Sequence, residues 1–176
     1  MTMIDSFSGR WRFLSNFYPA KIQHQGITYP TVEHYYVAMK IKNDQQIDGR
    51  DITYIDCREM IAKMPAEQAG KVKQLGRILK VRKDWEDVKM GVMLWGVREK
   101  FKHDDLKQML LDTGEQELIE GNWWHDNFFG VCTCGPCKGQ GQNNLGKILM
   151  KVREELKEQN KKPSLEDVLF PKDSLK

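Results

Sequence analysis

The chain has 176 residues, a length that suits one domain with its own core. Its residues are 40% hydrophobic and 30% charged, as in ordinary globular domains, and the formal net charge of +3 gives no argument for nucleic-acid binding. No apolar run approaches the roughly 18 residues of a membrane span, and no signal-peptide pattern opens the sequence. We therefore expect a cytoplasmic protein with reduced cysteines.

The first part of the chain predicts a strand, a hairpin and a helix. Alternating aromatic and basic residues within 7–17 favour a strand followed by a loop. Two short runs on either side of Gln25-Gly26 predict a hairpin. Thr31 is the expected N-cap of a helix from Val32 to about Lys42.

The rest of the chain is predicted to be mostly helical. Residues 55–79 have helical character with breaks, and a long helix is expected over 85–102, capped by Asp84. Another helix, capped by Asp104, is expected to end near Thr113-Gly114, a short strand is expected at 118–120, and the last helix covers about 145–159.

These elements predict an α+β fold, as one compact helix-rich domain with a small sheet. The domain is expected to span residues 1–160, and residues 161–176 are expected to form a polar tail. A loop rich in glycine and cysteine, residues 122–144, precedes the last helix.

The helix after Thr31 carries a carboxylate and an amine seven residues apart, Glu33 and Lys40. Seven residues are nearly two helical turns, so both side chains point the same way, roughly 10 Å apart along the axis. Two interpretations stay open from the spacing alone: a groove that holds a sugar between these groups, with Tyr36 on the same face, or a solvated charged stripe.

Residues 121–130 crowd two tryptophans, a histidine, an aspartate and two phenylalanines into one irregular segment. Such a segment either stacks its aromatic side chains on a ligand or folds them into the core. Asp126 is its only carboxylate, and is therefore a candidate acid, base or cation stabiliser.

Two further segments are candidates for binding a phosphate. On a strand, Arg10 and Arg12 would face one side and clamp an anion, although ordinary surface arginines would look the same. Backbone amides at the start of the last helix, near Asn143 and Asn144, also suit an anion, although a simple helix cap has the same sequence.

Cys132, Cys134 and Cys137 have the spacing of part of a thiolate zinc site. Only His125 or Cys57 is available as the fourth ligand. Because C-x-C-x-x-C is less specific than two separated C-x-x-C pairs, free thiols are the preferred interpretation. We expect no metal and no other cofactor.

Taken in order, the motifs resemble those of the NADAR family, also called the YbiA-like family, over roughly residues 7–156. The matching runs are FLSNF at 13–17, YPTVEHYYVAMK at 29–40, GR at 76–77, DWEDVKMGVM at 84–93, KF at 100–101, LLDTGEQELIE at 110–120, WHDNFFG at 124–130 and GQNNLGKILMKVR at 141–153.

The resemblance implies an α+β domain that hydrolyses N-glycosides. The best described family activity acts on ribosylamino-pyrimidine phosphates of early riboflavin synthesis, and other members remove ADP-ribose from modified guanine in nucleic acid. Some relatives use the lysine at the position of Lys40 as a Schiff-base nucleophile. The chain departs from the family where Val37 replaces a common glutamine and Phe129 a common tryptophan, and the cysteine cluster occurs in only a subset of relatives.

The expected mechanism has three catalytic residues. Lys40, made neutral by burial, attacks the anomeric carbon, Glu33 moves protons, and Asp126 stabilises the cation or activates water. The other candidates are expected to bind the base, the sugar or the phosphate: Arg10, Arg12, Phe13, Asn16, Tyr36, Trp85, Trp124, Phe129, Gly130, Asn143, Asn144 and Gly146.

The sequence thus predicts an N-glycosidase of small phosphorylated N-ribosides, with early riboflavin intermediates as the first candidates. One alternative is a glycohydrolase for ADP-ribosylated guanine, with nucleic acid only as the modified substrate. The other is a module that binds ADP-ribose or an NAD-related nucleotide without turnover. No membrane partner is expected, and the sequence gives no oligomeric state.

Overall fold

The structure, a computed structural model, describes residues 2–161. It is a helix-rich α+β domain, as predicted, but its strands form four separate two-stranded sheets instead of one small sheet. Apart from Lys161, which ends the last helix, the predicted tail over 161–176 lies outside the described residues. Within the described part, no helix is long and apolar enough to cross a membrane.

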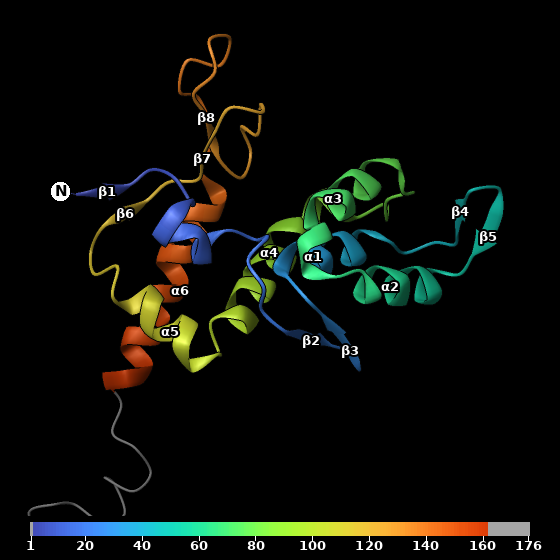
Figure 1. Cartoon of the computed structure of the whole chain (residues 1–176), viewed down its shortest axis with the longest axis horizontal. Helices are drawn as coiled ribbons and strands as arrows, with labels where there is room; N and C mark the ends of the chain where they lie inside the picture. The colour runs from blue at the N-terminus through green and yellow to red at the C-terminus, as the bar shows by residue number, and fades with distance from the viewer. Residues whose placement is uncertain (1, 162–176) are drawn as a thin grey trace, which may run out of the picture.

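Helix α1 (Val32–Lys40) lies at the centre of one half of the molecule, where α2 (Tyr54–Lys63), α3 (Ala69–Ile78) and α4 (Trp85–Lys100) pack around it (Figure 1). The predicted cap is present, because the hydroxyl of Thr31 accepts the amide of the third residue after it. Seven of the nine residues of α1 are buried, so this helix is part of the core on nearly all sides.

Two glycines allow the neighbouring helices to approach α1 closely. A Cβ atom at Gly96 of α4 would lie 2.8 Å from Cδ1 of Tyr35, and one at Gly76 of α3 would lie 3.0 Å from both methyl carbons of Val37. Val37 therefore packs against the backbone of α3, which explains why an apolar side chain suits this position.

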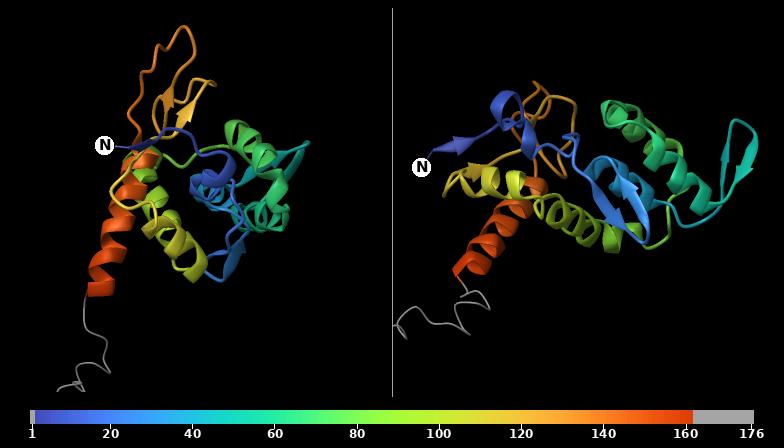
Figure 2. Two further views of the ribbon diagram at one scale, coloured as in Figure 1. Left: turned by 60° about the vertical axis from the view of Figure 1, so that its left-hand side comes forward. Right: turned by 60° about the horizontal axis from the view of Figure 1, so that its bottom comes forward.

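The other half of the molecule is built on the last helix, α6 (Asn144–Lys161), which packs on α4, on α5 (Asp104–Leu111) and on β6 (Glu117–Leu118). β6 pairs in parallel with β1 (Met3–Ile4). Figure 2 shows α6 beside α5 in both views, with the chain between α5 and α6 rising into a projecting arm.

The described part of the chain contains two hairpins. The predicted one pairs β2 (Ile22–His24) with β3 (Ile27–Tyr29). The second pairs β4 (Gln45–Ile47) with β5 (Arg50–Ile52), projects from the helices in Figure 1, and was not predicted. Its turn, Asp48-Gly49, has both φ angles positive, at 50° and 74°, which is the Asp-Gly hairpin signal.

The predicted strand near the amino terminus is wrong. Gly9–Leu14 forms a 3-10 helix, η1, in which the neighbours Phe13 and Leu14 are both buried. A half-exposed strand cannot bury two successive side chains, because they point to opposite faces. Arg10 and Arg12 therefore do not share one face of a strand.

Three smaller expectations also need correction. The carboxylate of Asp84 makes no cap bond and instead accepts two hydrogen bonds from Arg82, at 2.6 and 2.7 Å. Asp104 is the first residue of α5 and not its cap. The strand expected at 118–120 ends at Leu118, and the chain pairs again only at β7 (Gly121–Asn122), which lies parallel to β8 (Val131–Cys132). The breaks in the middle of the chain are present, and a short 3-10 helix, η2 (Ala66–Gln68), links α2 to α3.

Gly96→Ala is expected to lower the free energy of unfolding by about 1–3 kcal/mol, because the added methyl group overpacks the contact with the buried Tyr35 ring. Urea denaturation monitored by circular dichroism measures this change.

The matched control is Gly91→Ala, in the same helix, where an added Cβ meets nothing within 4 Å. This variant should raise the free energy of unfolding by up to about 1 kcal/mol through helix propensity. Equal effects of the two substitutions would contradict the close approach of α4 to α1.

Candidate active site

A cavity of about 420 Å³ lies where the turn after η1, α1, α3, α4 and the segment after β6 meet. Its wall contains three carboxyl groups, from Glu33, Glu120 and Asp126, and one lysine, Lys73. Aromatic side chains from the loop after β7 complete it. We call residues 123–129 the tryptophan loop.

Glu33 is in the first turn of α1 and is 8% exposed. Its backbone amide donates to the carbonyl of Asn16 at 3.1 Å, which places these two cavity residues side by side. Burial raises the pKa of Glu33 to about 7 against the opposing effects of Lys73 and Lys40, and Asp126 raises it further. A large share of the molecules therefore hold this carboxyl group protonated at neutral pH.

Glu120 carries another carboxyl group of the wall. The residue is half-buried, and its Oε2 is closed off from solvent. Burial raises its pKa to about 8, and Asp126 and Glu33 add to that rise while Lys73 opposes it. Among the described residues its Oε2 has no hydrogen-bond partner. No sequence motif marks Glu120 as a site residue, although its position after the apolar pair Leu118-Ile119 is a usable signal of burial.

Asp126 shapes the tryptophan loop as well as lining the cavity. Its Oδ1 accepts the amides of Phe128 at 3.2 Å and Phe129 at 2.9 Å. The buried Asn122 holds the same turn, because its Nδ2 donates to the carbonyl of Asp126 at 2.8 Å. The turn brings Phe129 against Tyr36, with ring centres 5.5 Å apart.

Lys73 is the residue that sequence reasoning missed most clearly. Its Nζ lies 5.8 Å from the ring centre of Phe17 and 5.7 Å from that of Trp124, which places the cation between two aromatic walls. It lies in the polar part of α3 without a motif around it, so only the packing of α3 against α1 brings it to the cavity.

Lys40 lies at the other end of α1 and does not line the cavity. Its Nζ donates to the carbonyl of Gly76 at 3.0 Å and lies 6.0 Å from the ring centre of Trp85. Burial lowers the pKa of Lys40, Glu33 and Glu86 oppose this effect, and Arg77 adds to it. The ring of Tyr36 lines the cavity, and its centre lies 4.9 Å from the ring centre of Trp85, the aromatic neighbour of Lys40.

A buried lysine, Lys100, supports the part of the cavity wall that carries Asn16. Lys100 is 1% exposed, and its Nζ donates to the carbonyl of Ser15 at 2.7 Å. Burial lowers its pKa to about 7. This bond fixes the turn that carries Asn16, whose Oδ1 is buried without a partner among the described residues.

The structure thus brings together only part of the predicted site. The predicted residues that line the cavity are Asn16, Glu33, Tyr36, Trp124, Asp126 and Phe129. Phe13 is buried in the core, and Gly130 is needed for packing because a Cβ there would lie 2.4 Å from the carbonyl oxygen of Glu120.

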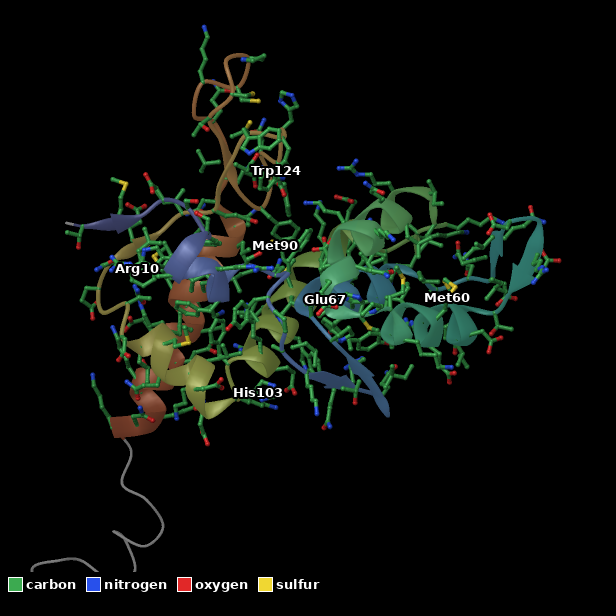
Figure 3. All side chains as sticks on the ribbon, in the orientation of Figure 1. Arg10, Met60, Glu67, Met90, His103 and Trp124 are labelled. Atoms are coloured by element: carbon green, nitrogen blue, oxygen red, sulfur yellow. The ribbon has the colours of Figure 1, made fainter. Side chains whose placement is uncertain are left out.

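Neither predicted arginine reaches the cavity. The guanidinium of Arg10 lies 4.5 Å over the ring of Trp11, and Figure 3 shows Arg10 beside η1, apart from Trp124. Arg12 lines a separate, larger depression of about 900 Å³ with Tyr18 and His103. The expected phosphate clamp is therefore absent from this cavity, because η1 is not a strand.

The start of α6 is also not an open anion site. The amides of Asn144 and Leu145 donate to the carbonyls of Phe128, at 3.3 Å, and Phe129, at 3.0 Å. The side chain of Asn143 bonds the amide of Glu120 at 3.0 Å and the carbonyl of Leu118 at 2.9 Å. A Cβ at Gly146 would lie 2.0 Å from that same carbonyl oxygen, so these residues join α6 to the strands and the tryptophan loop.

The fold and the cavity define a class, a helix-rich α+β domain with a ligand-sized cavity walled by carboxyl groups. Residues 6–157 match the model of the NADAR domain, and the chain belongs to this family. It is 40% identical over 146 residues to the N-glycosidase Npun_R5314 of Nostoc punctiforme, covering 81% of this chain and 84% of that protein. The solved structure of YbiA from E. coli superposes with a TM-score of 0.69 at 33% identity, covering 92% of this chain and 89% of that one.

Longer relatives carry a different name. The chain is 38% identical over 166 residues to the maize (Zea mays) riboflavin biosynthesis protein PYRR, chloroplastic, and 39% identical over 149 residues to the riboflavin biosynthesis protein VVA0006 of Vibrio vulnificus. These matches cover 88% and 83% of this chain but only 25% and 36% of those proteins. The family is therefore found both as a protein of about this size and as one part of larger proteins.

Glu120→Gln is expected to stabilise the protein, and the gain should grow as the pH rises from 4.5 to about 8. The unfolded chain releases this proton near the ordinary pKa of 4.5, whereas the folded protein keeps it up to about 8. In this window the folded state binds more protons, so the free energy of unfolding of the natural protein falls as the pH rises. Chemical denaturation at the two ends of the window measures the difference.

The control for the loss of one negative charge is Glu117→Gln, which removes an exposed carboxylate on β6, three residues before Glu120. A Glu120→Gln gain that is larger at the acidic end than at pH 8 would show that this carboxyl group is not buried in its neutral form.

Proposed function

We propose that the chain is an N-glycosidase that cleaves the bond between a ribosyl group and a nucleobase-like leaving group. The observation that carries this proposal is the pair of carboxyl groups in one cavity, with Glu33 buried and its pKa raised to about 7 and Asp126 half-buried in a hydrogen-bonded turn. Two carboxyl groups in such different environments suit the acid and the base of one reaction. Relatives of similar length are named N-glycosidases, which agrees with this assignment.

Cleavage of an N-glycoside builds positive charge at the anomeric carbon and requires a proton for the leaving nitrogen. In this proposal Glu33 supplies that proton, because burial keeps its carboxyl group protonated near neutral pH. The carboxylate of Asp126 stabilises the cation or activates the hydrolytic water. The rings of Tyr36, Trp124 and Phe129 stack on the base.

Lys40 is proposed as the nucleophile, through an imine. Its neutral amine forms a bond to the anomeric carbon of the ring-opened sugar, and the bond to the base nitrogen breaks as that nitrogen leaves with a proton. Water then hydrolyses the lysine imine, which frees the sugar and restores the amine. Burial lowers the pKa of Lys40, which shifts its amine toward the neutral form, and its Nζ must first leave the carbonyl of Gly76.

The substrate favoured by the cavity is a small ribosylamino phosphate. A volume of about 420 Å³ suits a ligand of that size. Lys73 is the basic residue that lines it, so we propose Lys73 as the partner of the phosphate in place of Arg10 and Arg12. Relatives named for riboflavin biosynthesis point to pyrimidine intermediates of that pathway as the first compounds to test.

A second candidate substrate is ADP-ribosylated guanine in nucleic acid. The observation that favours it is Trp123, which lines the cavity and is 74% exposed. An exposed indole at a cavity rim stacks readily on a neighbouring base of a single strand.

Purified protein is expected to release the base from ribosylamino-pyrimidine phosphates faster than it releases ADP-ribose from a modified oligonucleotide. Parallel assays with product detection by mass spectrometry compare the two rates. The opposite order would make modified nucleic acid the substrate. Tight binding of either compound without any product would make the chain a binding module.

Lys40→Arg is expected to abolish turnover, because arginine keeps the positive charge but cannot form an imine. Borohydride added during turnover should fix one sugar to the peptide that contains Lys40.

Lys73→Arg should raise the KM and still allow trapping on Lys40. Lys71→Arg, on the exposed side of the same helix, is the control. Glu33→Gln should lower the rate by roughly 100-fold or more.

A sugar trapped on Lys73 would move the imine to that residue, since Lys73 already lines the cavity. A Lys40→Arg enzyme with nearly normal activity and no trapped sugar would exclude the imine route. Glu33 and Asp126 would then act by direct attack of water.

A further inference from the structure

Three thiols and one imidazole meet beside the tryptophan loop, and the catalytic proposal uses none of them. Nδ1 of His125 lies 3.3 Å from Sγ of Cys137 and 3.4 Å from Sγ of Cys134, and the sulfurs of Cys132 and Cys134 are 3.3 Å apart. All four ligand atoms lie within 4.8 Å of one another. The sequence left His125 or Cys57 as the fourth member, and the structure selects His125, because Cys57 is buried in α2.

The three short separations are close to the edges of a tetrahedral metal site, and none of the six separations exceeds 4.8 Å. Zinc binds sulfur at about 2.3 Å and imidazole nitrogen at about 2.0 Å, which gives edges of about 3.8 Å between two sulfurs and about 3.5 Å between sulfur and nitrogen. The observed contacts are a few tenths of an ångström shorter, so small side-chain adjustments make room for one ion.

The donor set points to zinc among the common metals. Three thiolates and one imidazole contain no oxygen ligand, which excludes sites built for calcium or magnesium. Four protein ligands leave no open position, so the site is a closed structural one and not a catalytic one.

The backbone forms a tight turn between Cys134 and Lys138. The carbonyl of Cys134 accepts the amides of Cys137, at 3.1 Å, and Lys138, at 2.9 Å, and a left-handed Lys138 with φ of 51° turns the chain back. Nδ2 of Asn127 donates to Sγ of Cys137 at 3.5 Å, a contact that orients a metal-bound thiolate.

The ring of His125 faces the cysteines. Its φ is 66°, which turns the chain at this residue, and the polar contacts of its ring in the described structure are to cysteine sulfurs.

We propose that His125, Cys132, Cys134 and Cys137 bind one zinc ion, which fixes the tryptophan loop over the cavity. His125 lies between Trp124 and Asp126, both of which line the cavity, and the three cysteines follow on the far side of the loop. The arm that carries them rises above the helices in Figure 1, and its pairing at β7 and β8 covers only two residues in each strand. The ion therefore replaces the hydrophobic core that this arm does not have.

Elemental analysis of the full chain, purified under reducing conditions without added metal, should find about one zinc per molecule, as expected for a Cys₃His site. Cobalt exchanged into the site should give the visible bands of a tetrahedral ion and the near-ultraviolet absorption of thiolate coordination. Neither measurement depends on activity, so a failure of the proposed function would leave this test intact.

Cys134→Ser and His125→Ala should each lose most of the zinc, whereas Cys57→Ala, which removes a thiol outside the cluster, should keep it. Removal of zinc with a chelator should increase amide hydrogen exchange in residues 122–140 and leave exchange in α1 and α4 unchanged. If the proposed function holds, chelation should raise the KM more than it lowers kcat.

Three results would overturn the proposal. One is a zinc content near zero with all cluster thiols reactive toward a thiol reagent. Another is a disulfide between cluster cysteines in the native protein, seen by mass before and after reduction. The third is a cobalt spectrum without thiolate absorption.

Discussion

Helix α1 is buried against α2, α3 and α4, and its first turn carries the carboxyl group of Glu33 into this low-dielectric environment. Burial of a charge costs free energy unless the charge is paired, so Glu33 keeps its proton to about neutral pH even with Lys73 and Lys40 nearby. The acid of the candidate site thus follows from the packing of α1. Gly76 and Gly96 make that packing possible, because any larger residue would hold α3 and α4 away from α1.

The other wall of the cavity depends on polar contacts instead of a core. Asn122 and Asp126 close the tryptophan loop by hydrogen bonds to its backbone, and Asn143 ties the start of α6 to the backbone of Leu118 and Glu120. Short parallel pairs such as β7–β8 add little stability by themselves. One side of the site is therefore held by helix packing, and the other by hydrogen bonds in which the side-chain amides of Asn122 and Asn143 both donate and accept.

Local signals in the sequence were sufficient where neighbours in the chain are neighbours in space. The Thr31 cap, the hairpin at Gln25-Gly26 and the long helices are confirmed, because capping, turn chemistry and helical spacing act within a few residues. The same kind of reasoning failed for η1, since alternating aromatic and basic residues looked like a strand, whereas burial of both Phe13 and Leu14 does not fit a half-exposed strand. The dipeptide Asp48-Gly49 is a further local signal, since Asp-Gly is a common hairpin turn, and it forms the turn between β4 and β5.

The sequence alone determined the fold class, the family and the helix that carries Glu33 and Lys40, because motif order and helical spacing are properties of the chain itself. Only the tertiary structure decided which side chains share the cavity. Lys73 and Glu120 enter it, and Arg10, Arg12 and the start of α6 stay out, because these positions depend on how α3, η1 and α6 pack and not on local pattern. The same holds for His125, which joins the three cysteines because backbone hydrogen bonds within residues 122–140 fold this segment back on itself, which no spacing rule encodes.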